Sequence, residues 1–349
     1  MKNGSGLFCF SAFLKERRGV MPGRKIAMIL SLFAAGFFLL APGFAEAAAK
    51  TRLAVGGNGI GGVYYLYSGA VSQIINQSVP GAQATVEVVP GSSVEHVKRM
   101  QINDMQLGPA MNDVVFQAMK GTGQFKEPQT NIRTLFIMYP AVLQGVTLKK
   151  LQIRGPADLI GKRVSIGNPG TGSSVMTLAV LEALAVDPKK INLSYLNWNE
   201  GANAIRNGIL DVQFAAIGIP APFIMDLAAT HEIQLVSFSD SELAKIQEKF
   251  SYYPPAVIPK GSYGPVKEDV KVPGIWNSYL ATRELSDDLA YSITKAVYDN
   301  MAALKKAYKD ADQATAENTM KFSIAPLHPG AVKYYREKGI AVPDRLMPR

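Results

Sequence analysis

The stretch LIGKRVSIGNPGTGSSVMTLAVLEAL, residues 159–184, decides the fold of this chain. It predicts a short strand over Arg163–Ile166, a loop over Gly167–Ser174 and a helix from about Val175. The loop holds residues that permit a tight backbone path or can cap the helix: Pro169, Gly170, Thr171, Gly172, Ser173 and Ser174. The free amides and the positive dipole end of that helix suit a carboxylate or another anion. Such a turn is also common for purely structural reasons, so a binding role depends on a second wall elsewhere in the chain.

A second glycine-rich loop precedes this stretch in the chain. A strand over Thr51–Val55 leads into GGNGIGG, residues 56–62, and then into a helix whose first turn carries Tyr64 and Tyr65. The glycines match G-x-G-x-x-G, but the next strand ends at Val89 with no acidic residue at its tip, which argues against a dinucleotide site. The two tyrosines either line a cleft or pack beneath the loop, and we expect at least one of them in the cleft.

Polar or glycine-rich residues recur where predicted strands end. Besides the two loops they are Ser92 and Ser93, Asn112 or Asp113, and the turn from Gly218 to Pro220. Ser92 or Ser93 fits the N-cap of a following helix, although a simple capped helix explains the pair equally well. The alternation of strands and helices predicts an α/β protein with a mainly parallel sheet. Since ligands gather at the carboxyl ends of such strands, these tips predict a cleft between two lobes.

The N-terminus reads as an export signal. Arg24 and Lys25 precede the apolar run Ile26–Leu40 and then A-x-A sites, which predicts a signal peptide over residues 1–47. The run is short for a spanning helix of about 20 residues, so cleavage is favoured over an uncleaved anchor. Met21 is a more usual position for the initiator methionine of such a signal peptide. If translation begins there, residues 1–20 are not part of the protein. The sequence therefore predicts that the mature protein is exported to the periplasm.

Composition excludes several function classes. The chain has 349 residues and 48% hydrophobic residues, enough for two lobes with apolar cores. Removing six basic and two acidic residues with the signal lowers the net charge from +9 to +5, which gives no case for a nucleic-acid partner. Cys9 lies in the predicted signal peptide and is removed with it, so the mature chain is expected to have neither a disulfide nor a reactive thiol. Three His without a spaced cluster make a metal site improbable on chemical grounds.

Catalytic motifs are missing from the sequence. It contains no nucleophile elbow, no H-E-x-x-H and no phosphate-binding loop ending in G-K-[ST]. His96 and His231 fall in or beside predicted helices, and His328 lies between Leu327 and Pro329. A site rich in amides and hydroxyls but poor in acid–base groups binds without doing chemistry. We therefore predict a binding protein without cofactor or metal, and not an enzyme.

Several motifs, in this order along the chain, resemble the TAXI family of solute receptors. They are the tyrosine pair after the glycine-rich loop, GSSVEHV (91–97), MNDVVFQAMKG (111–121), DLIGKRVSIGNPGTGSSV (158–175), GILDVQFAA (208–216) and PLHPGAVKYYREKG (326–339). The last is the most specific piece. TAXI proteins are extracytoplasmic receptors of tripartite ATP-independent periplasmic (TRAP) transporters, and the resemblance spans the chain from about Lys50.

The resemblance implies a two-lobed, type II periplasmic-binding-protein-like fold, with lobes over 48–142 and 143–276 and a return to the first lobe over 277–349. It implies a small carboxylate ligand and TRAP membrane permease subunits as partners. The implied ligand contacts are Tyr64, Tyr65, Ser92, Ser93, Asn112, residues 169–174, Gly218 and Pro220. The chain departs from the family pattern at His96, Asn112 and Asp211–Phe214, which stand in or near this site. The 326–339 segment either docks the last helix onto its lobe or contacts the permease.

Two other functions compete with this prediction. An exported α/β enzyme could use the glycine-rich loops for a nucleotide or phosphate, but it needs an acid–base group and a cofactor that the sequence does not show. A receptor domain could also serve a signalling partner instead of a permease. A bound nucleotide in the purified protein would favour the former, and neighbouring genes for a multi-span membrane protein would disfavour the latter.

Overall fold

The computed structural model describes residues 50–59 and 62–348. Residues 49–349 form one compact unit. The predicted signal peptide and start site at residues 1–47 lie outside the described residues. Within the described part of the chain, no helix combines the length and apolar character needed to cross a bilayer.

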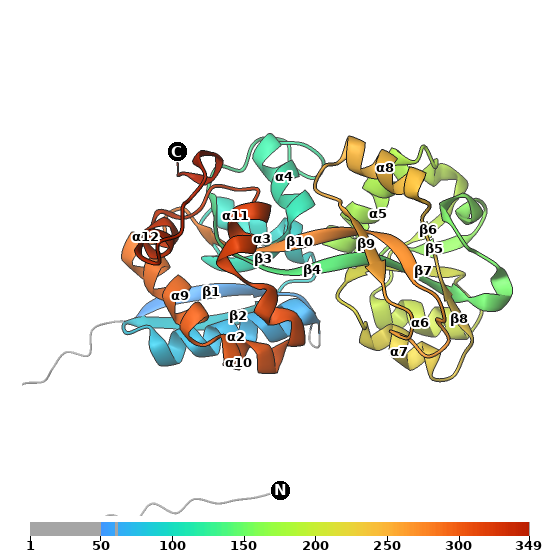
Figure 1. The fold of residues 1–349 in the computed structure, drawn as a ribbon, viewed down its shortest axis with the longest axis horizontal. Helices are drawn as coiled ribbons and strands as arrows, with labels where there is room; N and C mark the ends of the chain where they lie inside the picture. Colours follow the sequence, from blue (N-terminus) through green and yellow to red (C-terminus); the bar gives the residue numbers. More distant parts are fainter. Residues whose placement is uncertain (1–49, 60–61, 349) are drawn as a thin grey trace, which may run out of the picture. The chain divides into compact units, whose positions relative to one another are not determined.

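A single mixed sheet runs through the molecule (Figure 1). Its strands are β1 (Thr51–Gly57), β2 (Ala82–Val88), β3 (Leu107–Met111), β4 (Ile132–Leu148), β5 (Arg163–Ser165), β6 (Asn192–Ser194), β7 (Val212–Ile217), β8 (Ile233–Leu235), β9 (Pro255–Ile258) and β10 (Val270–Thr282). The order is β2-β1-β3-β10-β4-β7-β5-β6, with β8 on β4 and β9 on β10. The outer pairings are parallel, whereas β10 and β4 pair antiparallel with each other and with β3 and β7. The prediction of a mainly parallel sheet was therefore wrong at its centre.

Helices cover the sheet in two groups that define two lobes. The first lobe contains α2 (Val63–Ser78), α3 (Ser92–Gln101), α4 (Asn112–Lys120), α9 (Asp287–Asp299), α10 (Met301–Ala307), α11 (Ala316–Phe322) and α12 (Pro329–Glu337). The second lobe contains α5 (Gly172–Ala183), α6 (Trp198–Arg206), α7 (Pro222–Ala228) and α8 (Asp240–Lys249). In Figure 1 the first group surrounds β1–β3 and the second surrounds β5–β8.

The strands β4 and β10 pass through both lobes. One end of the pair lies beside β3 in the first lobe, and the other end lies beside β7 and β9 in the second. A proline within a strand, here Pro140 of β4, removes one backbone donor from the ladder and often ends it. The ladder instead continues, because Pro140 pairs with Trp276 next to a register shift where its missing N–H is tolerated. The predicted domain boundaries fall within these two strands and remain predictions.

Several predicted element ends move in the structure. The helix expected from about Val175 begins at Gly172, with Thr171 as its N-cap. The N-cap of α3 is Gly91, and neither Ser92 nor Ser93, because Ser92 is already the first helical residue. Asn300 separates α9 from α10, and the proline- and glycine-rich segment up to residue 273 contains β9 and the start of β10. Asn197 is the N-cap of α6, and Ser286 is the N-cap of α9.

The 326–339 segment docks the last helix onto its own lobe. His328 is the N-cap of α12, and its Nδ1 accepts a hydrogen bond from the Gly330 amide at 3.2 Å. A side chain at Gly330 would overlap the Asp287 carbonyl oxygen at the start of α9, so only glycine lets the two helices approach so closely. Tyr335 donates to the Leu135 carbonyl of β4 at 2.9 Å. Packing of this helix accounts for the most specific motif of the chain.

Aromatic side chains form the interior of the first lobe. Phe136 of β4 stacks on Tyr279 of β10 with ring centroids 5.0 Å apart, and Tyr67 of α2 lies 6.2 Å from Tyr279. All three side chains are fully buried. Such aromatic pairs add about 0.5–1.5 kcal/mol beyond their buried area, so this cluster holds α2 rigidly against the crossing strands.

Candidate functional site

The first glycine-rich loop ends at α2, whose N-cap residue is a glycine without a capping side chain. That N-cap is Gly62, and Asn58 of the loop instead accepts, through Oδ1, a hydrogen bond from the Tyr65 amide at 2.9 Å. Tyr64 is buried and donates to Asn277 Oδ1 at 2.5 Å, while Tyr65 is half-buried. Burial raises the pKa of the Tyr64 phenol, so it stays protonated. Tyr64 thus joins this loop to the crossing strand β10.

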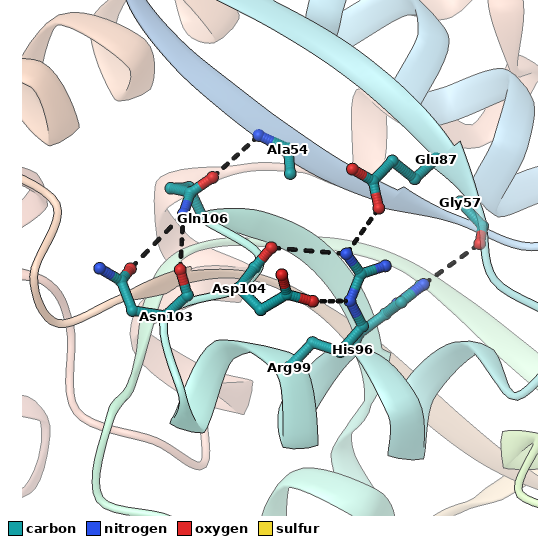
Figure 2. A network of polar contacts seen from close by, with 8 residues as sticks. All are labelled: Ala54, Gly57, Glu87, His96, Arg99, Asn103, Asp104 and Gln106. Atoms are coloured by element: carbon teal, nitrogen blue, oxygen red, sulfur yellow. Dashed lines mark hydrogen bonds and ion pairs between the residues drawn. The ribbon is translucent and has the colours of Figure 1, made fainter.

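A polar network behind the first loop supports it (Figure 2). His96 of α3 is fully buried, with Nδ1 2.7 Å from the Pro109 carbonyl and Nε2 3.2 Å from the Gly57 carbonyl. Burial lowers the His96 pKa to about 4, so the ring is neutral at pH 7 and can donate to only one of these oxygens. Arg99 pairs with Glu87 and Asp104, each at 2.6 Å. Together these contacts tie α3 to β1, β2 and β3.

The starts of α3 and α4 are braced within the first lobe. Ser93 Oγ accepts from the Met111 amide at 3.2 Å. Asn112 donates to the Phe322 carbonyl at 2.8 Å and accepts from Ser278 Oγ at 2.6 Å, which ties α4 to α11 and β10. Ser92 is buried and holds a φ of 33° in the left-handed region. Asn112 therefore orients the helix start, and its two hydrogen-bonding groups are already engaged.

The second glycine-rich loop satisfies its own polar groups. Thr171 Oγ1 accepts from the Ser174 amide at 3.4 Å, and Ser174 Oγ donates to the Thr171 carbonyl at 2.9 Å. Ser173 Oγ accepts from the Ala216 amide of β7 at 3.0 Å. Pro169 is exposed, and Gly170 has a φ of +75°. The hydroxyls of this loop thus serve largely to build it.

The two lobes touch where the second loop meets the starts of α3 and α4. A Cβ added to Gly170 would lie 3.7 Å from the Gly91 carbonyl, and one added to Gly172 would overlap the Met111 sulfur. The structure therefore brings together the predicted tips at 91–93, 111–112 and 170–172. Glycine at these positions lets backbone approach across the cleft.

A buried hydrogen bond also crosses between the lobes. Tyr253, which follows α8, donates to Asp113 Oδ2 at 2.5 Å, and both side chains are fully buried. Burial raises the Asp113 pKa to about 6, although the bonds from Tyr253 and the Val114 amide oppose that shift. Beside this bond, a hollow of about 330 Å³ lies between α4 and α5 and is lined by Phe116, Gln117, Val175, Leu178 and Tyr252, among others. The sequence offered either Asn112 or Asp113 as the polar residue at this strand end. In the structure it is Asp113 that makes the hydrogen bond between the lobes.

The tip of β7 forms the other side of the cleft. Gln144 donates to the carbonyls of Ile217 and Gly218 at 3.2 and 3.1 Å, and Tyr263 bridges Gln144 Oε1 and the Ala221 amide. The Ile219–Pro220 peptide is cis. These bonds hold the predicted Gly218–Pro220 turn against β4.

Three residues around this cleft were not predicted from the sequence. Tyr139 of β4 lies with its ring centroid 4.5 Å from that of Tyr308, which follows α10. Asn277 of β10 accepts from Tyr64 and donates to the Tyr139 carbonyl at 2.9 Å. No local pattern marks them, because they come from strand interiors and from the returning C-terminal segment. Only the crossing of β4 and β10 assembles them beside the predicted tips.

The electrostatics of the site come from backbone and hydroxyl groups and from the buried Asp113 carboxyl at the start of α4. Within the described residues, α2, α3 and α4 show no side-chain hydrogen bond at their N-caps. These helices follow β1, β2 and β3, which are mutually parallel in the order β2-β1-β3, so their N-termini share one edge of the sheet. The described part of the chain contains no group of three His, Cys, Asp or Glu side chains able to hold a metal ion. The arrangement can hold an anion by helix N-termini.

Comparison with known proteins identifies the family. The model of the NMT1-like family matches residues 55–339. The chain belongs to the NMT1-like family. Among solved structures, malate-bound MatC from Rhodopseudomonas palustris is 10% identical, and the match covers 83% of this chain and 97% of that one with a TM-score of 0.51. The aliphatic sulphonate binding protein SsuA from Escherichia coli is 12% identical over 84% and 94%, with a TM-score of 0.44. A galacturonate-bound TRAP solute binding protein from a Sulfitobacter species is 12% identical over 82% and 94%, with a TM-score of 0.43.

Membership of this family sets the coarse function. The fold is the two-lobed, type II fold of periplasmic binding proteins, as the sequence predicted. This NMT1-like protein is a solute-binding protein, and its family implies a small-molecule ligand and a membrane transporter as partner. A non-enzymatic role fits these relatives.

Proposed function

We propose that this protein is a TAXI-type extracytoplasmic receptor for a small carboxylate, namely an oxoacid, a dicarboxylate or a glutamate-like solute. The observation that carries the proposal is the meeting of helix starts from both lobes. The N-cap residues of α2, α3 and α4 make no side-chain cap, although Asn58 and Asp113 accept from one first-turn amide each in α2 and α4. The start of α5 lies against Gly91 and Met111. Each such N-terminus stabilises an anion by about 0.3–1 kcal/mol, and more where it is buried.

The proposed ligand contacts come from both walls of this cleft. On the first lobe they are Tyr64, Tyr65, Ser92, Ser93 and Asn112, and on the second they are residues 169–174, Gly218 and Pro220. None of these side chains is charged, so backbone amides and hydroxyls supply the attraction. We propose that the lobes close on the solute by a hinge at β4 and β10, with closure driven by the ligand's greater affinity for the closed form.

Calorimetry with a panel of solutes tests the ligand class. The purified mature protein should bind at least one of malate, 2-oxoglutarate, lactate and glutamate. If the protein bound only glucose or only metal cations, the proposal of a carboxylate ligand would be contradicted.

A matched pair of variants tests the helix starts directly. Gly91→Asp puts a negative charge at the N-cap of α3, whereas Gly91→Asn adds a side chain of the same shape without charge. The Asp variant should bind the carboxylate at least about tenfold more weakly than the Asn variant, because both side chains can cap the helix but only the aspartate repels an anion at this helix end. Equal affinities of the two variants would show that the α3 N-terminus does not meet the ligand.

We propose a TRAP-type permease as the membrane partner, and export by a cleaved signal peptide. Solute uptake by the receptor with its permease should follow an imposed ion gradient in vesicles that hold no ATP. A strict requirement for ATP would assign the partner to another transporter class. Mass spectrometry of the mature protein should find an N-terminus near Ala48.

A further inference from the structure

Two consecutive tyrosines of the second lobe, Tyr252 and Tyr253, reach helix α4 of the first lobe. They follow α8 and precede β9, which pairs with the second-lobe end of β10. The Tyr253 amide donates to the Phe250 carbonyl at 3.0 Å, and the Pro254 carbonyl accepts from the Gly274 amide of β10 at 2.7 Å. The two tyrosine rings meet edge to face, with centroids 4.7 Å apart. The pair is therefore fixed to the second lobe on both sides.

The two tyrosines meet two side chains that lie one turn apart on α4. Tyr253 donates to Asp113 Oδ2 at 2.5 Å, and both side chains are fully buried. Tyr252 lies with its ring centroid 5.1 Å from that of Phe116. Since residues three apart share one face of a helix, this face of α4 receives both tyrosines. We call Tyr252 and Tyr253 the tyrosine strap.

The seam beside the tyrosine strap is incompletely packed. The hollow of about 330 Å³ between α4 and α5 is lined by Val175 and Leu178 of α5 as well as by Phe116 and Tyr252. Apolar surfaces of the two lobes do not meet closely there, so their burial contributes little to holding the lobes together at this place. The buried hydrogen bond and the aromatic contact carry that role.

Separation of the lobes changes the surroundings of the Asp113 carboxyl. In the structure Oδ1 accepts from the Val114 amide at 2.7 Å, and Oδ2 has Tyr253 as its donor. In an open form water would hydrate both oxygens. Without the Tyr253 hydroxyl, the closed form would bury an unpaired carboxyl oxygen that the open form still hydrates. The hydroxyl therefore acts on the balance between the two forms.

We propose that the tyrosine strap holds the second lobe on α4 in the closed form, and that it thereby sets the strength of solute binding without contacting the solute. This inference rests on the hinge closure of the proposed function, and not on the chemical identity of the solute. Because the affinity for any solute depends on how readily the closed form is reached, every solute gains the same factor from the strap. That equality separates the strap from residues that contact the ligand.

Calorimetry on Tyr253→Phe tests the hydrogen bond, with malate, 2-oxoglutarate, lactate and glutamate as probes. The affinity for every probe that the wild type binds should fall by about tenfold, and by the same factor for each. Tyr335→Phe is the matched control, since it removes a buried hydroxyl that donates to the Leu135 carbonyl within the first lobe. It should lower the melting temperature and leave the affinities unchanged. Wild-type affinities in Tyr253→Phe would overturn the strap, and so would a loss confined to one of several bound probes.

Phe116→Leu, Tyr252→Leu and the double variant test the aromatic contact. Each single change should weaken binding by about threefold, and the double variant should bind no more weakly than either, because both changes remove one shared contact. Losses that multiply in the double variant would show that the two rings act separately, and would overturn this half of the strap.

X-ray scattering in solution separates the strap from the proposed function. Saturating solute should reduce the radius of gyration of the wild type and of Tyr253→Phe to the same value, because the strap shifts the balance between the forms and is not the hinge. If no probe binds the wild type or reduces its radius, the proposed function fails. The strap is then decided in the ligand-free protein, where Tyr253→Phe should have a larger radius than Tyr335→Phe and equal radii would overturn it.

Discussion

The two glycine-rich loops, 56–62 and 167–174, look alike in sequence but are built differently. Each follows a strand and leads into a helix. The second loop closes on itself, with Thr171 capping α5 and Ser173 bound to β7. At the first loop the N-cap of α2 is Gly62, which has no side chain, and Asn58 accepts from the Tyr65 amide one turn further on. Small-residue composition therefore predicts a turn but does not tell which backbone amides are left for a ligand.

The glycines of the two loops also serve different purposes. A Cβ added to Gly56 would lie 2.6–2.9 Å from three atoms of the His96 ring, so this glycine makes room for a side chain. Gly167 and Gly170 have φ values of 86° and 75°, a left-handed conformation that glycine adopts freely. The first loop is thus defined by packing and the second by backbone conformation.

The largest predicted effect concerns the bond between Asp113 of the first lobe and Tyr253 of the second. The Asp113 pKa is about 6 in the structure, against an ordinary value near 3.8 when separated lobes let water reach it. The closed form then binds the proton more tightly. Closure, and with it ligand affinity, should fall by up to about a hundredfold as pH rises from about 4 to 6, and should then stay level.

Asp113→Asn provides the control for this pH dependence, since it removes the charge and keeps an acceptor for Tyr253. The ratio of its lactate affinity to that of the wild type, measured by calorimetry between pH 4 and 8, cancels the titration of the ligand and of His96. The groups that face Asp113 are Tyr64, Tyr252 and Tyr253, whose raised pKa values keep them protonated throughout this range. A ratio independent of pH would contradict the prediction.

Gly56→Ala should destabilise the protein by about 2–3 kcal/mol in denaturant unfolding, because the new methyl group must displace a ring held between two carbonyls. Gly59→Ala in the same loop is the control, since nothing lies within 4 Å of its added Cβ. If the two variants were equally stable, the prediction that Gly56 makes room for the His96 ring would be wrong.

Gly170→Ala should cost about 1–2 kcal/mol through its left-handed backbone, with no clash to explain it. Gly170→Asn should cost less, because asparagine tolerates this conformation. If the two variants unfold at the same denaturant concentration, backbone conformation is not what selects glycine here.

Thr171→Ala should lower the free energy of unfolding by about 1 kcal/mol, the ordinary value of a lost N-cap. Thr171→Ser keeps the hydroxyl and should lie close to the wild type in the same urea titration. A larger loss in the serine variant than in the alanine variant would contradict capping as the role of this side chain.

Local signals in the sequence were enough for the elements that depend on neighbouring residues. The caps at Thr171, Asn197 and Ser286 and the strand–loop–helix units follow from side chains within three residues of the backbone group they satisfy. The mainly parallel sheet was wrong because β4 and β10 run antiparallel to each other and to β7 and β3. Pairing partners of this kind do not follow from a local pattern.

The sequence by itself determined the α/β class, the positions of the tight turns and the scarcity of catalytic groups in this protein. Only the tertiary structure decided which of those turns meet. Tyr64 is hydrogen-bonded to Asn277 and Asp113 to Tyr253, and Tyr308 packs against Gly218. The two partners in each pair are 90 or more residues apart in the sequence. The physical reason is that such contacts depend on the crossing of β4 and β10, which brings remote segments together and leaves no periodic trace in any of them.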